Sequence, residues 1–575
     1  MAMRISRTIT RISALCIAIA GGTTGAIALE QMVMGKFHTE LAQAGQNYSV
    51  TDGDRLFNQG IQQYEASQYR AAVQSWETAL GIYQQQGNRL RKSMVLANIG
   101  LAYYHLSDYQ RALEFQNQAL TLRQQLSDRQ GKAQSLGNIG LVYEALGQYQ
   151  RAIEFHNRSL KIKRDSKDQK GEAASLGNLG NAYYFLGQYE HAIDFHNRSL
   201  TIKRGIGDDY GAANSLDNLG NAYRSLGQPA QAIAFHRQAL AINNDLDNPF
   251  GKADSLGNLG NAYYSLGQYQ RAIDFYQQQI TIARQIEDRQ GEATALGNIG
   301  AAYDDLKQSK RAVEFYSQAL TINREIGDRP GEANSLANLG AAHYDLGQYE
   351  LAIVRFQEAL VIDRETKGRY GERVTLANLG RSFREIGQTD TAIALFKQAI
   401  NVTESIRRDN RHLDQNLQKS YVNVVADNYR ELADLLLTQG RILEAQQVLD
   451  LLSIQEINDY TQNTRAAVLP SGEIEYTDVE SDIRDRHDSL ISLGLEILRC
   501  QNLQNNCKDQ LSGLNQQRRK LKEEFNQLTA QIADRARDHA PREDGFQMVA
   551  GLGSSARKLV EQQDGTLFIN TFIDI

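Results

Sequence analysis

The sequence predicts an all-α protein, in which a solenoid of antiparallel helix pairs is followed by a C-terminal helical hairpin region. Three observations support this: a glycine recurs every 40 residues, apolar residues around it follow helical spacing, and only 5 of the 575 residues are prolines. The recurring glycines are Gly60, Gly100, Gly140, Gly180, Gly220, Gly260, Gly300, Gly340 and Gly380. A fixed period of this size is typical of a solenoid, whose units bury their apolar faces by stacking on their neighbours.

Each 40-residue unit is predicted to contain two helices. Between residues 256 and 266, apolar residues recur at steps of three and four, which places them on one face of a first helix. Gly267 then ends this helix, because glycine adopts positive φ at little cost. A second helix follows, and we expect the small residues Gly260 and Ala272 to face each other across the pair. Lys307 replaces the turn glycine in the seventh unit, where we expect a looser turn.

The unit resembles the tetratricopeptide repeat (TPR). The residues that carry the resemblance are Leu256, Leu259-Gly260, Tyr263, Gly267-x-Tyr269, Ala272 and Tyr276. The usual TPR period is 34 residues, so this period of 40 is similar to that of the kinesin light chain and LGN/Pins groups. The resemblance covers nine units in residues 54–404 and implies a right-handed superhelix of helix pairs. Such a fold is a weak guide to function.

The N-terminus is predicted to be an export signal. Residues 1–28 combine Arg4, Arg7 and Arg11 with an apolar run and the small-residue site Ala26-Ile27-Ala28. Cleavage there would leave a leader at 29–53 and an exported protein, periplasmic or extracellular. The alternative is an uncleaved N-terminal membrane anchor. Membrane contact is expected only through this segment.

The region after the nine units is predicted to stay helical. Residues 405–460 form a degenerate tenth pair or cap, 461–480 a linker, and 481–540 a helical hairpin. Leucines recur at seven within the hairpin, over too few heptads for a long coiled coil. On one continuous helix, Cys500 and Cys507 would be about 10.5 Å apart, too far for a disulfide. A turn at Asn505-Asn506 would permit the bond.

A second resemblance concerns the C-terminal part. The repeats, the stretch LLLTQGRILEAQQVLDLL at 435–452 and the paired cysteines resemble the N-terminal portion of bacterial, mostly cyanobacterial, TPR–CHAT proteins. In that family a caspase-like domain with a His/Cys dyad follows, so residues 541–575 would be its truncated start. No histidine follows His539 and no cysteine follows Cys507, so no catalytic residue can be transferred. We therefore expect a non-catalytic chain.

Composition and motifs exclude several functions. A net charge of −6 and a pI of about 6.0 do not favour nucleic-acid binding. We expect no cofactor, metal or small-molecule substrate, because metal-ligand spacings, phosphate loops and nucleophile motifs are lacking. His156, His196 and His236 recur at 40, but they occupy an aromatic position of the second helix, where packing is expected.

The candidate binding residues are asparagines of the first helices. One stands two residues before the marker glycine in eight successive units: Asn98, Asn138, Asn178, Asn218, Asn258, Asn298, Asn338 and Asn378. Asn181, Asn221 and Asn261 lie one turn later. Each amide offers a donor and an acceptor, which complement a peptide group. The resemblance to the light-chain and LGN/Pins repeats implies that this ladder lines a concave surface and grips an extended chain. Alternatively, the amides only bond neighbouring repeats.

Selectivity would come from other residues on that surface. Tyr184, Arg224, Tyr264 and Arg384 are candidates, because interface hot spots use aromatic and arginine side chains. Asp304, Asp305 and Asp345 make the later units acidic. Together these features predict a protein–protein interaction adaptor for a partner protein or an extended peptide. The alternatives are the recognition half of a split or truncated CHAT peptidase, a structural scaffold, and an inner wall that only meets solvent.

Overall fold

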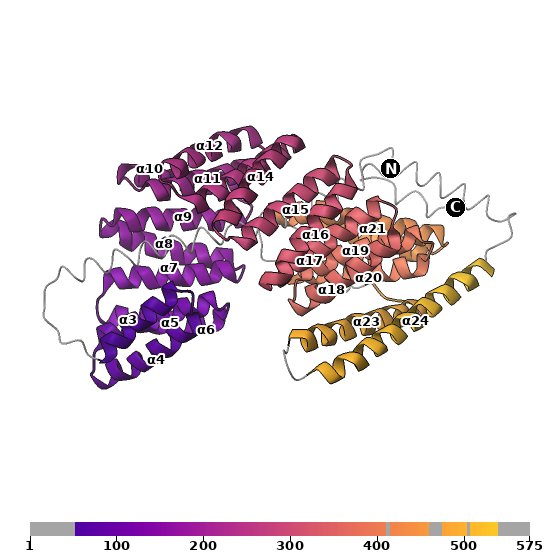
Figure 1. The fold of residues 1–575 in the computed structure, drawn as a ribbon, viewed down its shortest axis with the longest axis horizontal. Helices are drawn as coiled ribbons and strands as arrows, with labels where there is room; N and C mark the ends of the chain where they lie inside the picture. The colour runs from indigo at the N-terminus through magenta and orange to yellow at the C-terminus, as the bar shows by residue number, and fades with distance from the viewer. Residues whose placement is uncertain (1–51, 410–414, 459–473, 503–506, 539–575) are drawn as a thin grey trace. The chain divides into compact units, whose positions relative to one another are not determined.

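The computed structural model describes residues 52–409, 415–458, 474–502 and 507–538. Within them the chain forms 22 helices and no strand, which confirms the all-α solenoid (Figure 1). The predicted signal peptide, the leader up to residue 51 and the tail at 541–575 lie outside the described residues. No helix among the described residues is long and apolar enough to cross a membrane.

The described chain divides into two compact units, and the division falls between Ala295 and Leu296, within one helix, α15. The helices of the N-terminal unit are α3 (Asp52–Glu65), α4 (Tyr69–Gln85), α5 (Arg89–His105), α6 (Tyr109–Gln125), α7 (Arg129–Ala145), α8 (Tyr149–Asp165), α9 (Gln169–Phe185), α10 (Tyr189–Gly205), α11 (Asp209–Ser225), α12 (Pro229–Asp245), α13 (Pro249–Ser265), α14 (Tyr269–Gln285) and the start of α15 (Arg289–Asp305).

The C-terminal unit contains the end of α15, followed by α16 (Ser309–Ile326), α17 (Arg329–Asp345), α18 (Tyr349–Glu365), α19 (Arg369–Glu385), α20 (Thr389–Asp409), α21 (Gln415–Thr438), α22 (Ile442–Asn458), α23 (Asp478–Asn502) and α24 (Lys508–Asp538). In both units the odd-numbered helices from α3 to α19 are first helices of a repeat, and the even-numbered ones that follow are second helices.

Regular turns set the period of 40. Most helices have 17 residues and are joined by three-residue turns, whose middle residue has positive φ from Ser67 to Gly387. Gly267 has φ of 71°, and its N–H donates to the Tyr264 carbonyl over 2.8 Å. Lys307 keeps the same geometry, with φ of 63° and a 2.8 Å bond to the Asp304 carbonyl. The expected looser turn at Lys307 is therefore wrong, because the exposed lysine adopts the left-handed conformation and the turn keeps its backbone hydrogen bonds.

The marker glycine of each repeat makes room for a large side chain of the second helix. A Cβ on Gly260 would lie 2.4 Å from Cε1 of Tyr276, and one on Gly140 would lie 2.4 Å from Cε1 of His156. Tyr276, rather than the expected Ala272, is thus the residue that faces Gly260. His156, His196 and His236 are fully buried at this position, as predicted for core residues.

A second buried contact joins each repeat to the next. It involves the residue at the end of the second helix and a residue twelve positions later, in the following first helix. We call these the lock pairs. They are Arg123–Ser135 at 2.8 Å, Lys163–Ser175 at 3.1 Å, Lys203–Ser215 at 2.9 Å, Asn243–Ser255 at 3.2 Å, Asn323–Ser335 at 3.0 Å and Asp363–Thr375 at 3.1 Å. Where the first member is alanine, Ala283, the second is also alanine, Ala295, and both are fully buried.

The hairpin of α23 and α24 packs on the solenoid within the C-terminal unit (Figure 1). Asp488 of α23 pairs with Arg364 of α18 at 2.9 Å, and Gly494 lies so close to α18 that a Cβ would be 2.8 Å from Cγ2 of Val361. The helix begins at Asp478 rather than at Ser481, so Glu480 belongs to it instead of to the predicted linker. Glu480 is buried and pairs with the fully buried Lys397 at 2.8 Å.

Candidate functional site

The first helices of neighbouring repeats contact one another directly. In the N-terminal unit α5 contacts α7, α7 contacts α9, α9 contacts α11 and α11 contacts α13, and in the C-terminal unit α17 contacts α19. Among the described elements, no comparable contact joins two second helices. The first helices therefore form the more closely spaced layer of each unit, and this layer carries the row of asparagines.

The asparagines of this row differ in exposure. Asn98, Asn138, Asn178, Asn218 and Asn258 are partly exposed in the N-terminal unit, as is Asn338 in the C-terminal unit. Asn298 and Asn378 are buried, each at 5% exposure. The first group can meet a ligand, whereas the two buried amides are poorly placed for one.

Some of the candidate amides already have partners within the chain. Asn218 donates to Oδ1 of Asn181 in the preceding repeat over 3.3 Å, and Asn261 accepts from the Tyr276 hydroxyl over 2.8 Å. Asn378 accepts from Nη1 of Arg381 over 2.8 Å. Of these three bonds, Asn218–Asn181 joins neighbouring repeats, as a stacking role requires, and the other two lie within one repeat.

Other amides make no such contact. Among the described residues, none forms a hydrogen bond with the side chains of Asn98, Asn178, Asn221, Asn258, Asn298 or Asn338. The Asn138 Nδ2 is buried and has no partner there. An unpaired buried amide donor costs roughly 1–3 kcal/mol. The row therefore divides into amides committed to the stack and amides available to a ligand.

The residues predicted to confer selectivity also differ in whether their side chains have partners within the chain. Tyr184 and Ser225 share a hydrogen bond of 3.0 Å, and the Tyr184 ring packs on Tyr189 with centroids 5.5 Å apart. Tyr264 packs edge-on against Tyr269 at 5.3 Å. Arg384 pairs with Glu385 at 3.0 Å and with Glu431 at 3.5 Å, so its charge is compensated.

Arg224 differs from Arg384 in having no counterion among the described residues. Its side chain is partly exposed, its Nε is buried without a partner, and no described carboxylate pairs with it. It is near enough to Tyr189 and Tyr276 for its charge to lower both hydroxyl pKa values, although burial raises them overall. Arg224 is thus an available cation on the same layer as Asn221 and Asn258.

The sequence did not predict the partners that compensate the C-terminal arginines. Arg381 pairs with Glu431 at 2.9 Å and donates to Asn428 over 2.9 Å. Both partners lie in α21, whose register departs from the 40-residue period, so no spacing indicated the contact. These bonds make Arg381 and Arg384 part of the junction between α19 and α21.

A protein-family model matches nearly the whole of the repeat region. A model described as tetratricopeptide repeat matches residues 55–125, 91–165, 131–205, 171–245, 252–325 and 331–405, and a second model of the same description matches 218–285. Together these matches cover more than half of the chain.

The chain belongs to the tetratricopeptide repeat family. It is also similar to several solved structures. A Rap protein complexed with Competence and Sporulation Factor is 13% identical, with a TM-score of 0.41 over 62% of this chain and 99% of that one. The quorum sensor NprR from B. thuringiensis is 16% identical, with a TM-score of 0.45 over 58% and 95%. A putative kinesin light chain with TPR-like repeats from Podosopora anserina is 22% identical, with a TM-score of 0.30 over 34% of this chain and 95% of that one. No curated protein matches the sequence.

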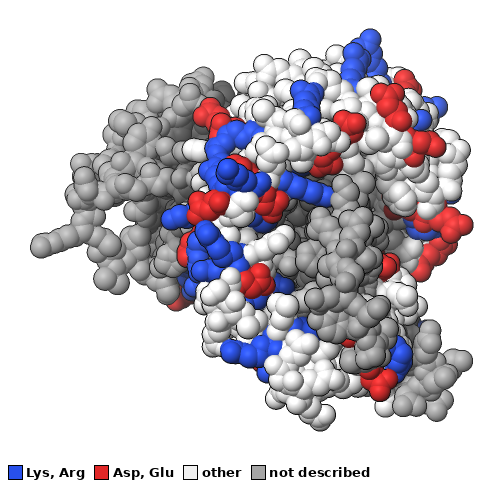
Figure 2. Space-filling view, turned by 90° about the vertical axis from the view of Figure 1, so that its left-hand side faces the viewer, with Lys and Arg blue, Asp and Glu red and all other residues white. Residues whose placement is uncertain are grey.

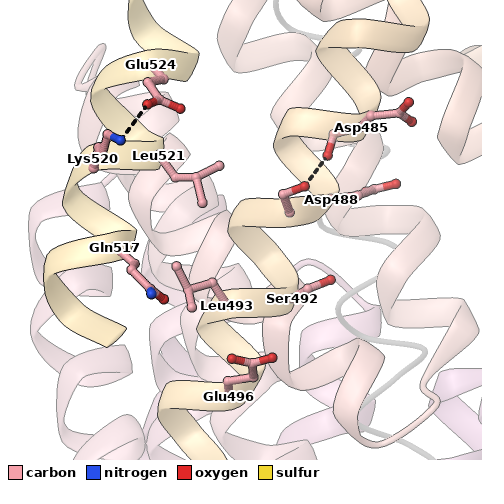
Figure 3. A pocket seen from close by; sticks show the side chains of 10 residues that line it. Asp485, Asp488, Ser492, Leu493, Glu496, Gln517, Lys520, Leu521 and Glu524 are labelled. Carbon is pink, nitrogen blue, oxygen red and sulfur yellow. Dashed lines mark hydrogen bonds and ion pairs between the residues drawn. The ribbon is translucent and has the colours of Figure 1, made fainter. Parts of the chain in front are cut away.

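This TPR protein also has a pocket outside the amide row. It has a volume of about 620 Å³ and lies between α23 and α24 (Figure 3). Asp485, Asp488, Glu496 and Glu524 line it, and Lys520 pairs with Glu524 at 3.7 Å. Asp488 is committed to Arg364, and no nucleophile is paired with a base among the lining residues. The pocket therefore offers weaker evidence for binding than the amide row.

The described residues contain no group of three or more His, Cys, Asp or Glu side chains that could hold a metal ion. On the face shown in Figure 2, basic and acidic side chains are interspersed among uncharged ones.

Cys500 and Cys507 are bonded in the structure, with Cα atoms 5.3 Å apart between α23 and α24. This bond joins the two helices of the hairpin and lies away from the amide row.

Proposed function

We propose that this TPR protein is a non-catalytic adaptor that binds an extended peptide, or an extended segment of a partner protein, along its first helices. The observation that carries the proposal is a set of partly exposed amides that have no partner among the described residues: Asn98, Asn178 and Asn258 in the N-terminal unit, and Asn338 in the C-terminal unit. An amide presents a donor and an acceptor to a peptide backbone. Arg224 and the tyrosines at 184 and 264 would add side-chain selectivity, because such residues dominate interface energetics.

Random peptides and a paired substitution test this proposal. A displayed library of 12-residue peptides is selected on the full chain, and affinities are then measured for Asn178→Ala combined with Asn258→Ala. Because each lost hydrogen bond costs about 0.5–1.5 kcal/mol, we expect binding to weaken roughly 10- to 100-fold. The matched control is Asn117→Ala combined with Asn157→Ala, two exposed asparagines on second helices.

The melting temperature separates binding from stacking. If the paired substitution leaves the melting temperature near that of the wild type, the two amides serve a ligand. A fall in melting temperature with unchanged binding would instead favour the structural scaffold, for which the Asn218–Asn181 bond is the supporting observation. Failure of all peptides to bind the wild-type chain would refute the adaptor.

We also propose that the protein acts after export, on the basis of the signal-like residues 1–28. N-terminal sequencing of the protein recovered from its parent cells should then begin at Leu29. A chain that retains its first residues in the membrane fraction would contradict cleavage and favour an anchor. The role as the recognition half of a CHAT peptidase depends on the sequence resemblance, and recovery of a caspase-like chain with this protein would support it.

A further inference from the structure

Two positions in neighbouring first helices lie against each other at the end of each repeat. Tyr184 and Ser225 are 3.0 Å apart in the N-terminal unit, and the Tyr344 hydroxyl donates to Oε1 of Glu385 over 3.2 Å in the C-terminal unit. Both pairs are separated by 41 residues. The geometry therefore places the last turn of one first helix beside that of the next, and we call this place the junction slot.

In the C-terminal unit, one junction slot holds two carboxylates. Asp304 at the end of α15 and Asp345 at the end of α17 are also 41 residues apart. Asp304 is only 9% exposed, whereas Asp345 is exposed. This slot thus has a buried carboxylate, Asp304, which we call the floor, and an exposed one, Asp345, which we call the rim. The Tyr184–Ser225 and Tyr344–Glu385 slots instead have a tyrosine hydroxyl and an acceptor.

The floor carboxylate lacks a partner for one of its oxygens. The Oδ1 atom of Asp304 is buried and accepts no hydrogen bond from the described residues. Among the described residues, Ser309 is the side chain that donates to this carboxyl. Lys307 in the same turn partly offsets the charges of both Asp304 and Asp345, whereas Asp305 adds a further negative charge. Burial and the negative charge of Asp345 raise the pKa of Asp304 to about 7. A buried acceptor beside a second acid is stabilised by a proton or by a cation.

The surroundings favour an organic cation over a metal ion. The described part of the chain contains no cluster of three potential metal ligands, and two carboxylates are fewer than calcium or magnesium sites usually supply. A lysine or arginine side chain can be bound by fewer acceptors than such a metal ion requires. Asn338, one of the available amides, lies seven residues before Asp345 on α17, which is about 10.5 Å along the helix. A peptide bound at Asn338 can therefore extend to the slot.

We propose that the Asp304–Asp345 slot is a specificity subsite that takes a lysine or arginine side chain of the bound peptide. This inference rests on the proposed function, because it assumes that a peptide lies along the first helices. It identifies the partner as one with a basic side chain at a fixed place. The junction slots Tyr184–Ser225 and Tyr344–Glu385 lack a carboxylate pair and would not share this preference.

The library selection tests the subsite directly. It is run on the wild type, on Asp304→Asn combined with Asp345→Asn, and on Glu314→Gln, an exposed control on α16. We expect lysine or arginine to be enriched at one peptide position on the wild type and on the control, and not on the double variant. Replacing that lysine by glutamine should weaken wild-type binding about tenfold and leave binding to the double variant nearly unchanged.

A proton readout distinguishes this role from a structural one. Because the cation would displace a proton from Asp304, calorimetry near pH 7 in buffers of different ionisation enthalpy should show proton release on binding. The single change Asp345→Asn at the exposed rim should reduce the preference even if the buried change impairs folding. Peptides that bind equally well with and without the basic residue would overturn the subsite and leave the adaptor intact. Absence of all peptide binding would overturn both.

Discussion

The Nζ of Lys203 lies 2.9 Å from the Oγ of Ser215 and 3.0 Å from the carbonyl of Gly211, across the boundary between two repeats. The ammonium is buried at 6% exposure and has no carboxylate within ion-pair distance among the described residues. Burial lowers the pKa of Lys203 to about 8, although the nearby Asp208 partly offsets this. The Lys203–Ser215 lock pair thus contains a buried ammonium group whose protonation depends on pH.

Stability should depend on the titration of Lys203. An unfolded lysine keeps its proton up to about pH 10.4, whereas the folded chain releases it near pH 8. Between these values the folded state binds fewer protons, so stability rises with pH. From pH 7 to pH 10, the free energy of unfolding of the wild type, measured in urea, should rise by about 1–3 kcal/mol relative to that of Lys203→Asn. This variant copies the lock pair that begins at Asn243. A constant difference across this range would contradict the pKa shift.

The effects of substituting Lys203 and Ser215 on stability should not be additive, because the two residues form one lock pair. Ser215→Ala alone leaves the Lys203 ammonium with one partner fewer, which should cost about 1–3 kcal/mol. The chain itself shows the compensated alternative, Ala283 with Ala295. We therefore expect Lys203→Ala combined with Ser215→Ala to be more stable than the two single changes add up to. Thermal melts of the four proteins in this double-mutant cycle measure the coupling, and simple additivity would exclude it.

The two glycines of one LGNIG motif should respond oppositely to substitution. A Cβ on Gly300 would lie 2.6 Å from Cε1 of Tyr316, whereas one on Gly297, three residues earlier on α15, would meet nothing within 4 Å. We expect Gly300→Ala to destabilise the protein by about 1–3 kcal/mol through overpacking. Gly297→Ala should stabilise it by about 0.5–1 kcal/mol, because alanine favours helices. Equal melting temperatures for the two variants would refute this packing.

A substitution at Gly494 should release the hairpin from the solenoid. A valine there would overlap Val361, which already lies 2.8 Å from the position of a Cβ. We expect Gly494→Val to increase hydrogen exchange and proteolysis in residues 478–538 while the amide row keeps its protection. Gly513→Val on α24 is the control, since a Cβ there meets nothing within 4 Å. Unchanged exchange in α23 would show that the hairpin is held by its ion pairs instead.

Much of the fold follows from the sequence because its determinants are local and repeated. The marker glycines, the helical apolar spacing and the turn glycines lie within one 40-residue unit, and the same pattern is present in nine units. The turn at Lys307 was misjudged, because composition indicates only local preference, and a lysine there adopts a conformation that favours glycine. The sequence did not predict the lock pairs, because their first members vary from arginine to aspartate although the second is serine in five of the six hydrogen-bonded pairs.

For the candidate site, the sequence determined the residues and the structure determined their availability. Eight asparagines in register were evident from the period alone. Only the structure shows that Asn218 bonds to Asn181 of the preceding repeat, that Asn378 bonds to Arg381 within α19, and that Asn258 has no partner among the described residues. The return of α23 onto α18 likewise depends on contacts such as Arg364–Asp488, 124 residues apart. A repeat period describes neighbours along the chain, and contacts across such distances are settled by packing.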